Sequence, residues 1–279
     1  MAEEKKIAEE RDEYNLNCKK EFYEDIIAQL EQVSSLQKDG KKQEAETMYN
    51  NLKDNLVSML DDSEFPEDKD TKWTNFDRSV LPCKGMVLGE NNRILLRAVS
   101  DNEYDDYMGV SYENSVMKSY FKDEEFKEDL WKTFIKDTAA MYSIIDKKTG
   151  DYVGYCGIKN LNEENWELAM ELLERYQHQG YGYDALTLML DKITRLTGQT
   201  VYRSKVDSDN YASQGLMKKI GGKPNGIREL FLHGDKLKEF QQENSHLIDD
   251  KLIKVADEFG VEPVDLIGHV LEFCIVWGS

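Results

Sequence analysis

The stretch that decides the fold runs from Trp166 to Gly182 and reads WELAMELLERYQHQGYG. It starts as an apolar run and ends in Gly180 and Gly182, in front of an apolar stripe of helical character: Leu186, Leu188, Leu190, Ile193 and Leu196. Glycine has no β-carbon, so main-chain amides at such a helix start can approach a ligand closely, and they carry the positive end of the helix dipole. We therefore expect a phosphate group at this helix N-terminus.

Two glycines alone do not separate a phosphate site from a connecting turn, because turns before helices often contain glycine. The neighbouring residues are more specific. The stretch resembles the acetyl-coenzyme A motif of the GNAT superfamily of N-acetyltransferases, in which Gln or Arg, two variable residues, Gly, one variable residue and Gly or Ala surround the pyrophosphate. Gln177, Gly180 and Gly182 fill the three defined places.

The resemblance extends from about Arg93 to Leu232, with the parts in the expected order. Residues 167–173 look like the central strand of the family and residues 201–206 like the next strand. The residues of 210–213 and 219–222 are similar to the second motif of the family, whose Asn and Ser face the cofactor. The branch that the sequence most resembles contains the ribosomal-protein alanine acetyltransferases.

The resemblance implies an α/β (α+β) protein with the GNAT fold, a mixed, mostly antiparallel central sheet flanked by helices. Residues 166–175 are rich in good helix formers, yet the alternation of Trp166, Leu168, Met170 and Leu172 suits a strand, and we expect a strand. Hairpins are expected at 84–88 with 93–99, with the turn at 89–92, and at 141–145 with 152–158. Helices are expected near 102–108 and 124–136.

The N-terminal part has a different texture. Phe22, Ile26, Leu30 and Val33 form an amphipathic stripe, and a second stripe at 48, 52, 56 and 59 follows the break at Gly40, so residues 1–62 are expected to form an all-α helical hairpin. We expect a linker at 63–83 and the GNAT domain at 84–279. A helix at 235–259 and a strand at 270–277 would make about 235–260 a helical insertion between the last two strands, beside the acceptor site.

Composition limits the partners. The formal charge of −19 disfavours binding to nucleic acid or to an anionic membrane and favours a cationic, amine-bearing partner. The chain starts with charged residues and has no run of about 18 apolar residues, so we expect a cytoplasmic protein. The four scattered cysteines are expected to be reduced, and the histidines have no spacing for a metal. The helical stripes are expected to pack within the chain or to form a homodimer.

The resemblance also implies a site that uses acetyl-CoA as cosubstrate and no metal. The cofactor-binding residues are expected to be Leu172, Leu173, Gln177, His178, Gln179, Gly180, Tyr181, Gly182, Tyr183, Asn210 and Ser213. The amine must lose a proton, and Glu167 is the first choice of base with Glu171 second. In a chain with 55 acidic residues, either could equally be a solvent-facing strand residue. The amide of Leu172, at a strand irregularity, would stabilise the oxyanion.

The sequence departs from the family pattern in several places. His178 stands where glycine is common, Glu174 where proline is common and Gly222 where an aromatic residue is usual. Met217 replaces the tyrosine that reprotonates the leaving thiolate in many members. Tyr211 could replace that acid or could simply pack. Cys156 could be a nucleophile, but no histidine is near it in sequence, and we expect a small core residue.

We therefore expect an N-acetyltransferase that moves an acetyl group from acetyl-CoA to a primary amine of a small molecule or protein, by direct attack in a ternary complex. The alternative is a catalytically inactive GNAT-fold module that binds acyl-CoA or a protein partner. A third hypothesis makes the helical hairpin the functional part, as an adaptor. The acceptor stays open among protein N-termini, lysine, aminoglycosides, polyamines and amino-acid derivatives.

Overall fold

The computed structural model describes residues 28, 30, 32–50, 72, 74–115, 118–229 and 232–278 of the chain. The chain divides into two compact units, Met1–Thr71 and Lys72–Ser279. In the first unit, residues 32–38 and 42–50 are helical, and Gly40 between them has a φ of +76°. Val33 and Ala45 are buried. These residues agree with the expected helix–turn–helix, and the rest of the predicted hairpin lies outside the described residues.

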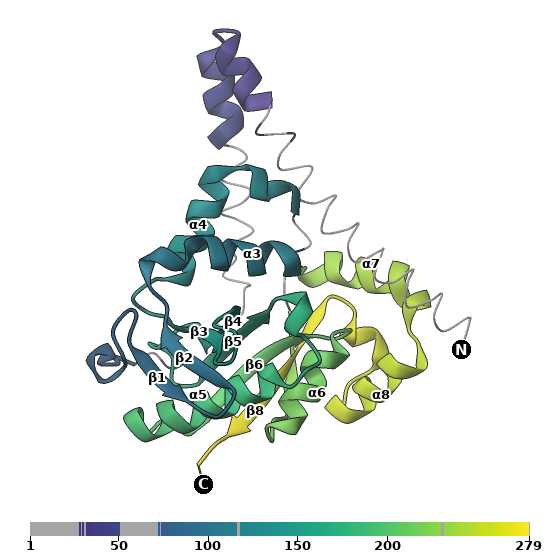
Figure 1. Cartoon of the computed structure of the whole chain (residues 1–279). Helices are drawn as coiled ribbons and strands as arrows, with labels where there is room; N and C mark the ends of the chain where they lie inside the picture. The colour runs from purple at the N-terminus through teal and green to yellow at the C-terminus, as the bar shows by residue number, and fades with distance from the viewer. Residues whose placement is uncertain are drawn as a thin grey trace. The chain divides into compact units, whose positions relative to one another are not determined.

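The second unit is an eight-stranded sheet with helices on both faces (Figure 1). The strands follow the order β1-β2-β3-β4-β5-β6-β8-β7, and all neighbours are antiparallel except β5 and β6. This is the mixed, mostly antiparallel sheet that the sequence predicts. The strands are β1 Val87–Glu90, β2 Ile94–Ala98, β3 Ala140–Asp146, β4 Tyr152–Ile158, β5 Trp166–Leu172, β6 Val201–Asp207, β7 Lys223–Glu229 and β8 His269–Val276.

The helices of this unit fall on two sides of the sheet. Helices α3 and α4 lie on one face, and α5, α6 and α8 lie on the other (Figure 1). Short 3-10 helices connect several elements. The α-helices are α3 Tyr104–Asn114, α4 Glu124–Phe134, α5 Tyr181–Thr197, α6 Tyr211–Lys219, α7 Gly234–Asn244 and α8 Asp250–Phe259.

Strand β5 is the centre of the sheet, and its side chains alternate between two hydrophobic cores. Trp166, Leu168 and Leu172 join the core beneath α5, whereas Ala169 and Leu173 join the core beneath α3. Because β4 and β6 flank it and both of its faces are covered, pairing and burial outweigh the helix propensity of its residues. The predicted strand is confirmed.

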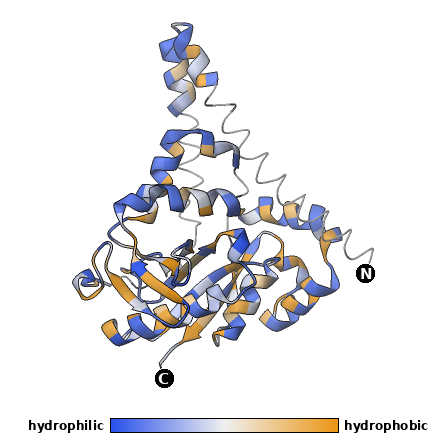
Figure 2. Cartoon of the chain, viewed as in Figure 1, coloured by the Kyte–Doolittle hydropathy of each residue, from blue (hydrophilic) through white to orange (hydrophobic). Residues whose placement is uncertain are grey.

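Helix α5 follows the pattern read from the sequence. Its buried residues recur at helical spacing and include Ala185, Leu186, Met189, Leu190 and Ile193. Gly198, with a φ of +77°, ends the helix in the left-handed conformation that glycine adopts without strain. The division of the helices into apolar and polar residues can be followed in Figure 2. The buried stripe fixes how α5 lies on the sheet, and so where its N-terminus points.

Three boundaries differ from the sequence-based expectation. The second unit begins at Lys72 and not at residue 84, because Phe76 packs edge-on against Trp166 at 4.8 Å and Leu81 is buried in the core. Gly89 and Glu90 belong to β1 and not to the turn. The predicted helix at 235–259 is two helices, α7 and α8, separated by a 3-10 turn at Ser245–Leu247. Both helices lie between β7 and β8, where the insertion is expected.

Candidate active site

An opening lies between the two parallel strands at the middle of the sheet. Strand β5 pairs with β6 only at Trp166 with Tyr202 and at Glu167 with Arg203. Strand β6 instead stays paired with β8 along its whole length. From Leu168 onward, the edge of β5 that faces β6 is therefore unpaired in this register.

The hydrogen bonds to β4 show which main-chain groups face that opening. Leu173 N donates to Val153 O at 3.0 Å, and Lys159 N donates to Glu167 O at 2.9 Å. In an antiparallel pair, hydrogen-bonded residues alternate with residues whose main-chain groups point to the other side. The residues that point into the opening are therefore Leu168, Met170 and Leu172.

The expected strand irregularity at Leu172 is absent. The register between β4 and β5 runs without a shift from Leu172 to Leu168. The shift lies in the β3–β4 pairing, between Ile144 and Ile145. An inserted residue in one strand changes which side chains share a face. As a result, Tyr152 and Tyr155 of β4 both contact the core beneath α3.

Gly154 brings β4 close to β5 opposite Leu172. Its φ is +148°, and a β-carbon there would lie 2.2 Å from Glu171 O and 2.8 Å from Leu172 Cα. Any other residue would push the two strands apart at this point. The sequence analysis did not single out this glycine, although a glycine inside a strand pattern is a known signal of close backbone approach.

The loop before α5 ends in a glycine with left-handed geometry. Gly180 has a φ of +88° and precedes the first turn, in which Asp184 N donates to Gly180 O at 3.1 Å. The amides of Tyr181, Gly182 and Tyr183 therefore have no acceptor within the helix. Three free amides at the positive end of a 17-residue helix form an anion site.

Gly182 and His178 have different structural roles in this loop. A β-carbon on Gly182 would lie 3.0 Å from Met170 Cε and 3.2 Å from Leu216 Cδ2, so glycine allows α5 to pack closely on β5 and α6. His178 has a φ of +56°, and among the described residues it alone combines a side chain with a positive φ. The left-handed conformation explains why glycine is common at this place in the family motif.

A residue outside the predicted set supports the loop. Arg93 Nη1 donates to Gln179 O at 2.8 Å and lies 3.4 Å from Asp184 Oδ2, and the guanidinium lies 3.7 Å above the ring of Tyr181. The Tyr181 hydroxyl in turn donates to Asp146. Asp184 would repel an anion at the start of α5, and Arg93 offsets that charge.

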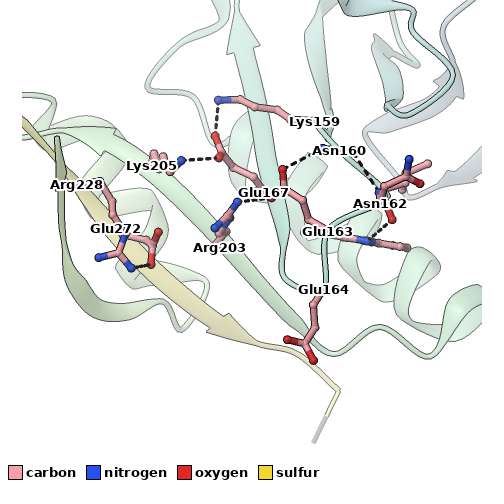
Figure 3. A network of polar contacts seen from close by, with 12 residues as sticks. Lys159, Asn160, Asn162, Glu163, Glu164, Glu167, Arg203, Lys205, Arg228 and Glu272 are labelled. Carbon is pink, nitrogen blue, oxygen red and sulfur yellow. Dashed lines mark hydrogen bonds and ion pairs between the residues drawn. The ribbon is translucent and has the colours of Figure 1, made fainter. Parts of the chain in front are cut away.

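Glu167 lies among positive charges (Figure 3). Its Oε1 is 2.5 Å from Lys159 Nζ and its Oε2 is 3.3 Å from Lys205 Nζ. Burial raises the pKa of this carboxyl, but the two ammonium groups together outweigh burial, and the net pKa is lowered. A carboxylate with a lowered pKa is a weak base.

Glu171 lies four residues further along the same face of β5, in a different environment. Burial raises the pKa of its carboxyl to about 7, against smaller lowering effects from the Tyr155 hydroxyl and the charge of Lys159. Within the described part of the chain, its buried Oε2 has no hydrogen-bond partner. The group can therefore exchange a proton near neutral pH.

The other predicted positions are distributed as follows. Asn210 caps α6, since its Oδ1 accepts from Ser213 N at 3.0 Å. Met217 is buried in the core, and Lys251 lies 5.5 Å above the ring of Tyr211. Cys156 is fully buried, and burial raises the pKa of its thiol far above the usual range, so it is the expected core residue.

Neither a metal site nor a membrane span is found in the described ranges. No group of three or more His, Cys, Asp or Glu side chains there is placed to hold a metal ion. His233 instead pairs with Glu229 at 2.5 Å. None of the helices in those ranges has the length and apolar character needed to cross a membrane.

The sheet, its central opening and the glycine-initiated helix define the GNAT class of α/β proteins. Residues 93–223 match the sequence profile of the acetyltransferase (GNAT) domain. The chain carries a GNAT acetyltransferase domain, which places it among the acyltransferases. No curated protein sequence matches the chain.

Several solved structures are similar to the chain. The ribosomal L7/L12 alpha-N-protein acetyltransferase RimL in complex with coenzyme A is 14% identical, with 68% of this chain and 97% of that chain covered and a TM-score of 0.49. The ribosomal-protein-S5-alanine acetyltransferase of Vibrio fischeri is 12% identical, with 68% and 98% covered and a TM-score of 0.46. The spermidine/spermine N-acetyltransferase SpeG of Vibrio cholerae is 13% identical, with 66% and 92% covered and a TM-score of 0.45.

Proposed function

We propose that the protein transfers an acetyl group from acetyl-CoA to a primary amine, by direct attack of the amine nitrogen on the thioester. The observation that carries this proposal is the opening beside β5, which has the free amides of α5 at one end and Glu171 on the strand. Binding, polarisation and proton removal each have a candidate group within this short stretch of chain.

The free amides of Tyr181, Gly182 and Tyr183 suit the diphosphate of acetyl-CoA. The unpaired edge of β5 suits the pantetheine arm, because its amides offer the hydrogen bonds of a missing neighbouring strand. At the end of that edge, the N–H of Leu172 is oriented to donate to the thioester oxygen as negative charge develops there. The predicted cofactor residues thus remain candidates, and Arg93 joins them as a support of the loop.

We assign the base to Glu171 and not to Glu167. An alkylammonium has a pKa near 10, so a group that accepts its proton at neutral pH must itself titrate near neutrality. The pKa of Glu171 is about 7, whereas two ammonium groups lower the pKa of Glu167. In the proposed reaction, Glu171 accepts the amine proton directly or through a water molecule. The nitrogen then attacks the carbonyl carbon, and the C–S bond breaks to release the coenzyme A thiolate.

The charge on the acceptor side supports a cationic acceptor. A cavity of about 570 Å³ lies between α3 and the turn that joins β3 to β4. Burial and the charges of Glu103 and Asp105 raise the pKa of Asp106 there. Such a surface attracts an amine that carries positive charge. The carboxylates that line the cavity, Glu103, Asp105, Asp106, Glu113 and Asp151, outnumber its two guanidinium groups, Arg97 and Arg175.

The test measures thiol release from acetyl-CoA with a panel of primary amines: lysine, spermidine, an aminoglycoside and short peptides with free N-termini. With the best acceptor, Glu171→Gln should lower kcat by about 100-fold or more, the usual contribution of a general base. Acetyl-CoA binding, followed by calorimetry, should stay close to that of the parent. Glu167→Gln is the matched control on the same strand face and should keep most of the activity.

Three outcomes would contradict parts of the proposal. If Glu167→Gln abolished turnover and Glu171→Gln did not, the base would be Glu167. If the parent bound acetyl-CoA but acetylated none of the amines, the inactive acyl-CoA-binding module would be the better description. If calorimetry detected no binding of acetyl-CoA, the assignment of the anion site would be wrong.

A further inference from the structure

The last residue of α3 contacts the end of β5. Asn114 Nδ2 donates to Val110 O at 2.8 Å, within the helix, and to Leu172 O at 3.1 Å. Both neighbours of this nitrogen are carbonyl oxygens, which only accept hydrogen bonds, so the side-chain amide has a single orientation. A side chain outside every motif of the sequence thus holds the strand at the proposed thioester site.

Gln177, the first residue of the phosphate motif, contacts the same carbonyl. Its Nε2 donates to Leu172 O at 3.0 Å and to Asn114 Oδ1 at 3.1 Å. A carbonyl oxygen has two lone pairs, and these two amides occupy both. The N–H of the same peptide, that of Leu173, donates to Val153 O. The peptide that follows Leu172 is therefore fixed at both of its polar groups.

Helix α3 has a second attachment to the segment between β5 and α5. Glu113 Oε2 accepts from Glu174 N at 2.8 Å. The same helix contacts the surroundings of the proposed base, because the ring of Tyr107 lies 5.8 Å from the ring of Tyr155, whose hydroxyl lowers the pKa of Glu171. One helix thus contacts both the phosphate loop and the acceptor side.

We propose that Asn114 is a positioning residue that, with Gln177, holds the end of β5 and links α3 to the diphosphate loop. Acetyl-CoA that binds the loop then stabilises the C-terminal turn of α3 through this link. The inference rests on the proposed function, because it needs acetyl-CoA at the loop. Its physical basis is that a ligand which orders one segment also reduces the opening of segments bonded to it.

The test is amide hydrogen exchange in peptides that span residues 104–114, with and without saturating acetyl-CoA, in the full-length chain. In the parent, acetyl-CoA should slow exchange there by about threefold or more, since one net hydrogen bond of about 1 kcal/mol corresponds to a fivefold change. In Asn114→Ala the protection should vanish, while the acetyl-CoA Kd from calorimetry rises by less than about tenfold.

Two further variants separate hydrogen bonding from packing. Asn114→Asp keeps the size of the side chain but has no N–H donor when ionised, so it should lose the protection as Asn114→Ala does. Tyr112→Phe, on the same helix and half exposed, should behave like the parent. If Asn114→Ala does not fold, Gln177→Ala breaks the link from the loop side and should lose the protection.

Each result bears on a stated claim. Protection of α3 in Asn114→Ala equal to that in the parent would overturn the inference, and so would full protection in Asn114→Asp. A parent that binds acetyl-CoA without any protection of α3 would overturn the inference and leave the proposed function intact. A parent that binds no acetyl-CoA would overturn both.

Discussion

Replacing the proposed base should stabilise the folded protein at the pH where it removes activity. Glu171→Gln exchanges a carboxylate for a neutral group of the same size. Because the folded state raises the pKa of this carboxyl from about 4.5 to about 7, the folded protein binds the proton more tightly than the unfolded chain does. The stability that the proton provides is complete below the unfolded pKa and is lost as the pH rises through the folded pKa.

The size of the effect follows from the pKa. Each pKa unit corresponds to 1.36 kcal/mol, so the ionised Glu171 costs at most roughly 3 kcal/mol above pH 7. The new amide of glutamine needs its own partners, which leaves a net gain of about 2 kcal/mol. For a unit of about 200 residues, 1 kcal/mol shifts Tm by roughly 2–4 °C, so Glu171→Gln should raise Tm by about 4–8 °C at pH 8. At pH 4.5 the gain should be near zero.

The assay is thermal unfolding followed by circular dichroism between pH 4.5 and 8.5, using the transition of the larger unit. Glu167→Gln is the matched control and should have the opposite sign at pH 8, because it leaves Lys159 and Lys205 without their carboxylate. A Tm difference for Glu171→Gln that does not change with pH, or that is negative at pH 8, would refute the burial argument.

Three other substitutions test neighbouring parts of the site. Tyr155→Phe removes a hydroxyl that lowers the pKa of Glu171, so the acid limb of the kcat/KM profile should move up by about one pH unit, while Tyr152→Phe should leave it in place. His178→Val should destabilise by about 1–2 kcal/mol and His178→Gly by nothing measurable in thermal melts, because φ is +56° there; equal melts for the two would refute the strain argument. Gly154→Ala should lower Tm by more than 5 °C, roughly 2 kcal/mol, because its β-carbon would meet Glu171 O at 2.2 Å, and a Tm within 2 °C of the parent would contradict this.

Local rules predicted most of the fold. The periodicity of apolar residues predicted the hairpins β1–β2 and β3–β4 and helix α5, because one side of each element must be buried. The glycines of the loop marked positions that need a left-handed backbone or a close approach. The boundaries at residue 72 and within 235–259 were wrong, because the packing of Phe76 and the turn at Ser245–Leu247 depend on contacts that no local pattern contains.

The sequence by itself determined that two carboxylates, Glu167 and Glu171, stand on one face of a strand that leads into a glycine-rich helix start. Only the tertiary structure decided how they differ. Lys205 reaches Glu167 from β6, whereas Glu171 is buried beside Tyr155 of β4. The two residues have the same chemistry and the same orientation on the strand, and their pKa values separate because charge and burial come from other elements of the fold.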